Sequence, residues 1–228
     1  MKKAILSYFI LAGFILISAG AANAQSILGD ILRRMDEHNK SLQTLKASLK
    51  MSKYNAQIDE YDVYSGTVQY IPSQDRNRIR VRIDWEKPDV EQLSIAGGEY
   101  VLFKPRLNQA IVGKVDSAKN AARSGNALDF LSMNRKQLRD NYEVAYLGEE
   151  TVNSNVRTWH LQLTPKTAKS YKVAELWVDK DGMPVQAKIT ENNKDTTTIL
   201  LSDIQKNVSL KAQDFAIKLP KDVKKIPG

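Results

Sequence analysis

The side chains that could carry acid–base, nucleophilic or metal chemistry are few in this sequence. Two histidines and no cysteine occur among 228 residues, so a thiolate nucleophile and a cysteine-bound metal are excluded. His38 stands among polar residues, and no acidic or serine-based motif marks it as a base. His160 alternates with Trp159, which predicts a solvated position on the opposite face of a strand. The pair Glu149 and Glu150 is interpreted as a solvated strand end.

The stretch DKDGMP, residues 179–184, gathers acidic side chains, but a tight turn explains it better than calcium binding. It lacks the remaining ligand positions and the final glutamate of a calcium-binding loop. The sequence also contains no G-x-S-x-G, no H-E-x-x-H and no glycine-rich phosphate loop. We therefore expect a protein that is not an enzyme and that uses no metal or cofactor.

Residues 76–89, RNRIRVRIDWEKPD, alternate charged and apolar side chains. Alternate side chains of a β-strand point to opposite faces. The charged face would carry Arg76, Arg78, Arg80, Arg82 and Asp84, and the apolar face Ile79, Val81, Ile83 and Trp85. The basic stripe could bind nucleic-acid phosphates, could be attracted to anionic membrane lipid, or could be a solvated outer face that discourages pairing with another chain. The export signal described next, with few exposed aromatic residues nearby, argues against nucleic acid.

The elements that position these residues begin after a targeting segment. Residues 1–3 (MKK) are a short basic start, residues 4–19 are apolar, and residues 22–24 (ANA) place small side chains where a signal peptidase reads them. We expect a signal peptide over residues 1–24, with cleavage after Ala24 and a periplasmic mature chain that starts at Gln25. An uncleaved membrane anchor is the alternative, since the apolar run is slightly long for a signal.

The remaining residues, 25–228, are interpreted as a single domain. They contain no internal repeat, low-complexity tract or obvious linker, and their number suffices for a sizeable core. They hold 32 basic and 26 acidic residues, a net charge of +6. An exported fold without cysteine must be stable without disulfides.

Hydrophobic periodicity predicts one N-terminal helix followed by many short strands. From Ser26 to Leu42 apolar residues recur at three- and four-residue spacing, and after Thr44 the period changes to two. Strand-like runs continue to about Val115 and resume from residue 142, ending in a strand over residues 215–220. Residues 116–140 predict one or two short helices. We expect an α+β, mainly antiparallel fold of about eleven strands.

One face of this sheet collects apolar side chains. They are Leu49, Met51, Val68, Tyr70, Ile79, Val81, Ile83, Trp85, Leu93, Ile95, Trp159 and Leu161. By the period-two rule alone these are core residues. However, one amphipathic helix and one broken helical insertion supply little apolar surface to cover so many strands. A curled, half-open β-barrel with a helical lid over an apolar hollow fits better, because the mouth of a barrel commonly binds an apolar ligand.

Several short motifs give the chain a resemblance to a known family. They are YSGTVQYI (64–71), DWEKPD (84–89), LSIAGGEYVLFKPRLNQAIV (93–112), NALDFLSM (126–133), LQLTPK (161–166), ELWVDKDGMP (175–184) and FAIKLPKDVK (215–224). In their order and spacing they resemble the periplasmic outer-membrane lipoprotein carrier proteins of the LolA type. The match covers residues 26–226 but departs at Tyr70-Ile71-Pro72, where the family has a K-R-P turn whose arginine holds the lid shut. That latch is therefore not carried over, and Arg76 or Arg78 is the candidate substitute.

The resemblance implies a monomeric shuttle for acylated lipoproteins. Such a carrier takes its cargo from an inner-membrane ABC-type transporter and passes it to an outer-membrane receptor. It also implies a lid formed by Leu128, Phe130, Leu131 and Met133. Two other classes stay open: a relative that carries lipids or glycolipids or senses lipoproteins, and a structural β-domain without a ligand.

Overall fold

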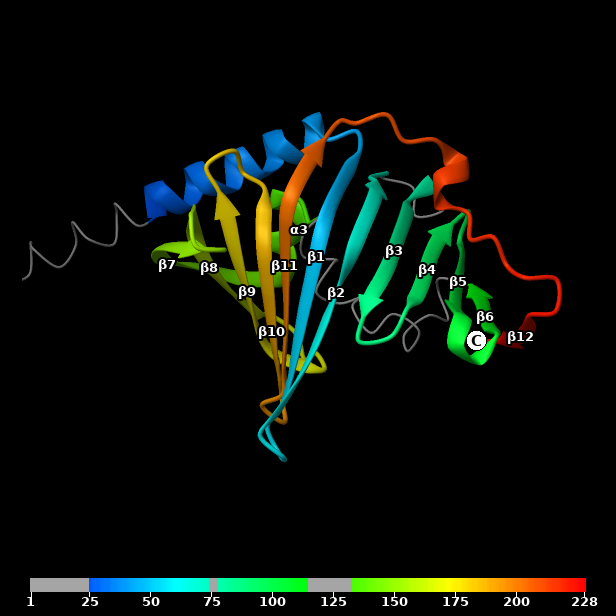
Figure 1. Ribbon diagram of the computed structural model, residues 1–228. Helices are drawn as coiled ribbons and strands as arrows, with labels where there is room; N and C mark the ends of the chain where they lie inside the picture. Colours follow the sequence, from blue (N-terminus) through cyan, green and yellow to red (C-terminus); the bar gives the residue numbers. More distant parts are fainter. Residues whose placement is uncertain (1–24, 74–77, 115–132) are drawn as a thin grey trace, which may run out of the picture.

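The alternating segments of the chain form one twelve-stranded sheet in the computed structural model, which describes residues 25–73, 78–114 and 133–228 (Figure 1). The strands are β1 (Leu45–Asn55), β2 (Glu60–Ile71), β3 (Arg80–Lys87), β4 (Glu91–Ala96), β5 (Glu99–Lys104), β6 (Gln109–Lys114), β7 (Tyr142–Val152), β8 (Val156–Pro165), β9 (Tyr171–Asp179), β10 (Pro184–Glu191), β11 (Thr196–Lys206) and β12 (Lys224–Pro227). Their order is β12-β6-β5-β4-β3-β2-β1-β11-β10-β9-β8-β7.

The sheet is curled and open. Neighbouring strands are antiparallel except β12, which runs parallel to β6, and the end strands β7 and β12 do not pair with each other. The predicted mainly antiparallel, half-open architecture is confirmed, with twelve strands instead of about eleven. Because β3 lies between β2 and β4, its arginines do not protect an exposed sheet edge, and that interpretation was wrong.

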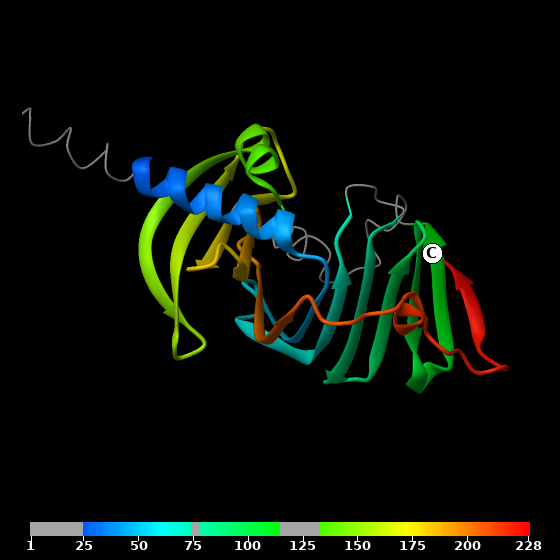
Figure 2. The same cartoon turned by 90° about the horizontal axis from the view of Figure 1, so that it is seen from above.

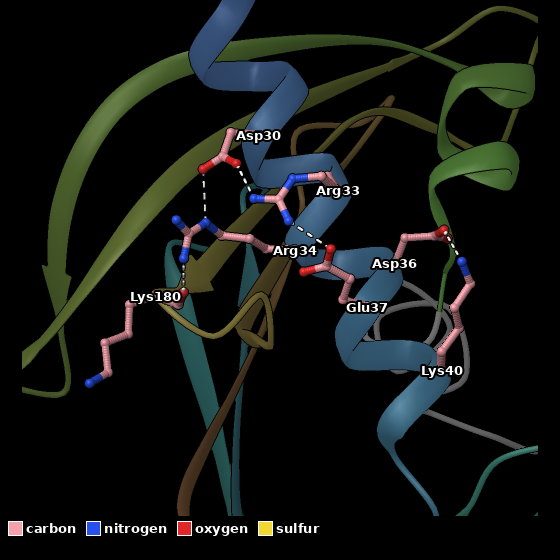
Figure 3. Close-up of polar contacts among 7 residues, drawn as sticks. All are labelled: Asp30, Arg33, Arg34, Asp36, Glu37, Lys40 and Lys180. Carbon is pink, nitrogen blue, oxygen red and sulfur yellow. Dashed lines mark hydrogen bonds and ion pairs between the residues drawn. The ribbon is translucent and has the colours of Figure 1, made fainter.

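The N-terminal helix, residues 25–41, runs along the half of the sheet that carries β7–β11 (Figure 2). Its apolar stripe, Ile31, Leu32 and Met35, is at most 1% exposed and belongs to the same buried cluster as the inner face of the sheet. This is the face that the three- and four-residue spacing predicts. The opposite face carries ion pairs one turn apart, Asp30–Arg34 and Asp36–Lys40 among them (Figure 3). Hydrogen bonds from the guanidinium groups of Arg34 and Arg33 lower the pKa of Asp30.

A short second helix, α3 (Arg135–Asn141), precedes β7. The side chains of Asn134 and Gln137 each accept a hydrogen bond from the other residue's backbone N–H, which forms a capping box. The one buried residue of α3 is Leu138, which is inaccessible to solvent and joins the core cluster. The helical insertion expected over residues 116–140 is thus observed in its last part, while residues 116–132 lie outside the described residues.

The β9–β10 hairpin packs directly against the N-terminal helix. The carboxylate of Asp179 accepts hydrogen bonds from the backbone N–H groups of Asp181 and Met183, so the acidic stretch forms the predicted tight turn. Gly182 has φ +82, and a Cβ atom there would lie 2.3 Å from the carbonyl oxygen of Arg34. The Arg34 guanidinium donates a 3.2 Å hydrogen bond to the Lys180 carbonyl oxygen (Figure 3). Helix and hairpin therefore meet backbone to backbone, and only glycine fits the contact.

The segment after β11 crosses the outer face of the sheet and packs against β3 and β4 (Figure 2). It contains a 3-10 helix, η4 (Ala212–Phe215), and residues 216–220 form neither helix nor strand, so the strand predicted over residues 215–220 was wrong; the last strand is β12. Phe215 is fully buried, and its carbonyl oxygen accepts a 2.6 Å hydrogen bond from Ser94. Arg82 donates a 2.6 Å hydrogen bond to the Ala216 carbonyl oxygen and forms an ion pair with Asp84 at 2.8 Å. The predicted solvated charged face is thus wrong at Arg82, which anchors the C-terminal segment.

The helix–hairpin contact yields a test based on two glycines with positive φ. At both Gly182 and Gly97, alanine pays about 1–2 kcal/mol for the left-handed backbone. A Cβ at Gly97 meets nothing within 4 Å, whereas one at Gly182 overlaps the helix backbone. We expect Gly182→Ala to lower the free energy of unfolding by roughly a further 1–3 kcal/mol. Urea melts of the two variants measure the difference, and equal losses would contradict the backbone contact.

Candidate binding site

The inner face of the sheet carries a continuous row of apolar side chains. Directly paired residues of neighbouring strands share a face. One such row crosses the strands from β1 to β12 and consists of Ala47, Val68, Ile83, Leu93, Leu102, Ile111 and Ile226. A parallel row starts at Leu45 and continues through Tyr70, Val81, Ile95 and Tyr100. The apolar half of the RNRIRVRIDWEKPD alternation is therefore one strand of a sheet-wide apolar surface.

Burial divides this surface into a dry part and an accessible part. Val68, Ile83 and Leu93 are at most 4% exposed. Side chains of the same face that are only partly buried surround them: Tyr64, Tyr70, Val81, Ile95, Leu102 and Ile111. We call these six residues the apolar patch. Partial exposure of six neighbouring apolar side chains marks the inner face of β2–β6 as the place where an apolar ligand could lie.

The outer face of the same strands is arranged differently. Phe103 and Ala110 face outward and are buried, and Ser94 beside them is bonded to the C-terminal segment. The C-terminal segment thus covers one side of β3 and β4, while the apolar patch stays partly exposed on the other. On β3 and β4, the partly exposed large apolar side chains, Val81 and Ile95, therefore lie on the inner face.

The residues predicted for the hollow fall into three groups. Seven are core residues at most 7% exposed: Leu49, Met51, Val68, Ile83, Trp85, Leu93 and Leu161. Four are partly buried and pack against that core: Tyr70, Val81, Ile95 and Trp159. Ile79 lies one residue before β3 and is partly exposed.

Two of these residues lie on the half of the sheet along which the N-terminal helix runs. Leu161 and Trp159 belong to β8, and the guanidinium of Arg34 lies 5.5 Å from the centre of the Trp159 ring. They are therefore placed with the helix rather than with the apolar patch.

Of the predicted lid, Leu128, Phe130 and Leu131 lie outside the described residues. Met133 is described: it is partly buried against the core cluster. Its carbonyl oxygen accepts a 3.0 Å hydrogen bond from the side-chain amide of Asn39 on the N-terminal helix. The chain that follows residue 132 is thus attached to the helix.

Three residues of the apolar patch, Tyr64, Leu102 and Ile111, were not predicted as site residues. The runs EYVLFK and QAIVGK are apolar on both faces, so alternation alone does not tell which side chains point inward. The pairing of Leu93 with Leu102, and of Leu102 with Ile111, decides it.

The two histidines are buried rather than solvated. His160 is 7% exposed, stacks on Trp177 at 4.2 Å between ring centroids, and lies between the carboxylates of Glu150, at 2.8 Å, and Glu175, at 3.2 Å. A hydrogen bond from the Trp177 indole, with help from His160, lowers the pKa of Glu150. His38 is 6% exposed, and burial lowers its pKa. The prediction of a solvated His160 was therefore wrong, whereas Glu150 is exposed near the end of β7, as predicted.

This polar group does not belong to the apolar patch. His160 alternates with Leu161, which faces inward, so the histidine and its carboxylate partners lie on the outer face of β7–β9. Within the described residues, no three histidine or acidic side chains are placed to hold a metal ion. The inner face of β2–β6 offers apolar contact instead of acid–base groups.

The fold and the inner face define the class of the protein: an open, curled antiparallel sheet around a helix, with an apolar surface on its inner side. A family model described as "Outer membrane lipoprotein carrier protein LolA" matches residues 41–218. The chain belongs to this family. The comparison with curated proteins finds no match.

The comparison with solved structures finds similar chains at low sequence identity. An uncharacterized conserved protein from Thermus thermophilus is 16% identical, with a TM-score of 0.56 over 88% of this chain and 99% of that chain. A LolA superfamily protein from Nitrosomonas europaea is 16% identical, with a TM-score of 0.41 over 85% and 97% of the two chains. Lipoprotein LppX from Mycobacterium tuberculosis is 12% identical, with a TM-score of 0.47 over 80% and 99%. Within the described ranges, no helix combines the length and apolarity that crossing a bilayer requires.

Adjacent inward-facing residues of β3 test whether the apolar patch is accessible. Ile83 has no exposed surface, whereas Val81 is partly exposed. We expect Ile83→Glu to cost several kcal/mol and unfold the protein, because the carboxylate has no access to water. Val81→Glu should cost about 1 kcal/mol or less, since its carboxylate reaches solvent. Urea melts check both values, and loss of folding in Val81→Glu as well would mean that this face is a dry core.

Proposed function

We propose that this protein is a periplasmic carrier that holds the acyl chains of lipoproteins against the apolar patch. The observation that carries the proposal is the partial exposure of six neighbouring apolar side chains on the inner face of β2–β6. Membership of the lipoprotein carrier family supports it. The role is one of binding and transport, without catalysis.

The chemistry of the apolar patch suits acyl chains. Each buried methylene contributes about 0.8 kcal/mol, so an acyl chain does not cross an aqueous compartment unaided at a useful rate. A hydrocarbon chain needs apolar area rather than directional hydrogen bonds. The patch supplies that area from six side chains on five neighbouring strands.

The cellular route of the proposed carrier follows from the family and from the N-terminal segment. We assign residues 1–24 to a cleaved signal peptide and residues 25–228 to one carrier domain in the periplasm. The proposed partners are acylated lipoproteins, an inner-membrane ABC-type transporter that releases them and an outer-membrane receptor that accepts them. The carrier is proposed to act as a monomer, and a lid containing Leu128, Phe130, Leu131 and Met133 stays a prediction.

Acyl binding is tested with a matched pair of valine substitutions. Val81 belongs to the apolar patch, whereas Val63 on β2 points to the outer face, opposite to Tyr64, and is 49% exposed. We expect Val81→Glu to abolish binding of a fluorescent acylated peptide, because a hydrated carboxylate in the patch excludes the chain. Val63→Glu introduces the same charge and should bind as the unsubstituted protein does.

The measurement is a fluorescence titration of each folded variant, with native mass spectrometry of the purified protein as a second readout. Retained acyl species in the unsubstituted protein and in Val63→Glu, but not in Val81→Glu, are the expected result. Normal binding by folded Val81→Glu would place the ligand elsewhere. No acyl binding by any form would refute the carrier function.

A further inference from the structure

Two exposed apolar side chains lie at adjacent turns on one border of the sheet. Val90, in the β3–β4 turn, is 57% exposed, and Leu107, in the 3-10 helix η2 (Pro105–Leu107) between β5 and β6, is 55% exposed. Both turns lie at the lower border of the sheet as drawn in Figure 1, where β12 also begins. Each of these residues keeps more than half of its surface in water.

Polar contacts join these turns to the C-terminal segment. Arg106 forms an ion pair with Asp89 at 3.1 Å across the two turns. The Asn108 side-chain amide donates a 2.9 Å hydrogen bond to the carboxylate of Asp222, and the backbone N–H of Lys224 donates one of 2.9 Å to the carbonyl oxygen of Asn108. We call the joined residues 88–90, 105–108 and 221–225 the basic border. It is one surface built from three segments that lie far apart in the sequence.

The basic border has a net charge of +2, from four basic and two acidic side chains. Asp89 forms an ion pair with Arg106, while Asp222 accepts a hydrogen bond from the neutral side-chain amide of Asn108 and keeps its negative charge. Three exposed lysines, Lys221, Lys224 and Lys225, have no ion-pair partner among the described residues. The basic border therefore combines two apolar side chains with three free ammonium groups.

Protection of the sheet edge explains only part of this surface. Lysines and a proline on the edge strand β12 discourage pairing with another chain. That role does not require Val90 and Leu107, which lie in turns and expose apolar surface that favours association. An apolar pair flanked by lysines suits an interface between water and negatively charged lipid, where lysines meet headgroups and apolar tips enter the acyl boundary.

A second pair of exposed apolar side chains lies among acidic rather than basic residues. At the tip of the β1–β2 hairpin, Ile58 and Tyr61 are 61% and 67% exposed, and they lie among Asp59, Glu60 and Asp62. An anionic bilayer would repel this tip. Of these two exposed apolar surfaces, the basic border and the acidic hairpin tip, only the basic border is complementary in charge to anionic lipid.

We propose that the basic border docks the protein on the surface of an anionic lipid bilayer. The association is peripheral and reversible, because it rests on three lysines and two short apolar side chains rather than on a membrane-spanning segment. It does not depend on the acyl-binding function, since it uses the border of the sheet and not the apolar patch.

The test measures binding of the processed chain, from Gln25, to vesicles of phosphatidylethanolamine and phosphatidylglycerol in equal amounts. We expect binding that is absent with pure phosphatidylcholine vesicles and is lost at about 1 M salt, where the Debye length falls to roughly 3 Å. Replacing Lys221, Lys224 and Lys225 together by glutamine should weaken binding on the order of 100-fold, from the usual contribution of a lysine at an anionic surface. Leu107→Ser should weaken it several-fold.

Matched controls separate the basic border from general properties of the chain. Glutamine at Lys169, Lys172 and Lys194 removes the same charge from exposed positions in the other half of the protein, and Ile58→Ser removes an exposed apolar side chain of the acidic tip. Both control variants should bind as the unsubstituted chain does. Val81→Glu should also bind vesicles normally, so a failure of acyl binding is distinguished from a failure of docking. Equal loss in the two lysine variants, or no salt-sensitive binding to anionic vesicles, would overturn the proposal.

Discussion

The structure depends on a mismatch between the width of the sheet and the helical surface available to cover it. Twelve strands spaced about 4.8 Å apart extend over roughly 50 Å along the curve, and every strand from β1 to β6 presents apolar side chains inward. The helix of residues 25–41 is about 25 Å long, and the seven residues of α3 add about 10 Å. The described helices are therefore long enough to exclude water from only about one half of the inner face. The other half keeps apolar side chains that are only partly buried, and curling of the sheet narrows the surface without closing it.

The outer face of β3 and β4 is covered by the C-terminal segment instead of by a helix packed across the sheet. Arg82 and Ser94 both donate to backbone carbonyl oxygens of the C-terminal segment, which fixes Phe215 on β3 and β4. The outer face thus gains buried apolar area and satisfied hydrogen bonds without an additional helix. Both sides of β3 and β4 thus contribute buried contacts, and the inner side also keeps the partly exposed Val81 and Ile95 available for a ligand.

The sequence predicts those features of the fold and site that depend on residues close together in the chain, and it does not predict those that depend on distant residues. The alternation from Arg80 to Trp85, the Asp181-Gly182 turn and the helix spacing are local patterns, and the structure confirms them. Arg82 and Ala216 are 134 positions apart, so no local pattern reveals their contact. The burial of His160 depends on a bulge in β7 between Tyr146 and Gly148, which turns Glu150 from the inner to the outer face. Alternation read from a single sequence assumes an unbroken strand and therefore does not reveal that Glu150 lies beside His160.

The partial exposure of the apolar patch also bears on how the proposed cargo leaves. Complete burial of a sixteen-carbon acyl chain would contribute about 13 kcal/mol at 0.8 kcal/mol per methylene, which corresponds to a sub-nanomolar dissociation constant for each chain. A site that buried several chains completely would not release them to a receptor. Side chains such as Tyr70, Val81 and Ile95 are already partly covered by their neighbours, so each has less apolar area left to bury against a ligand. The contacts are also non-directional, which allows an acyl chain to be withdrawn methylene by methylene. The same incomplete cover that leaves the sheet open thus keeps acyl binding within a range from which transfer can proceed.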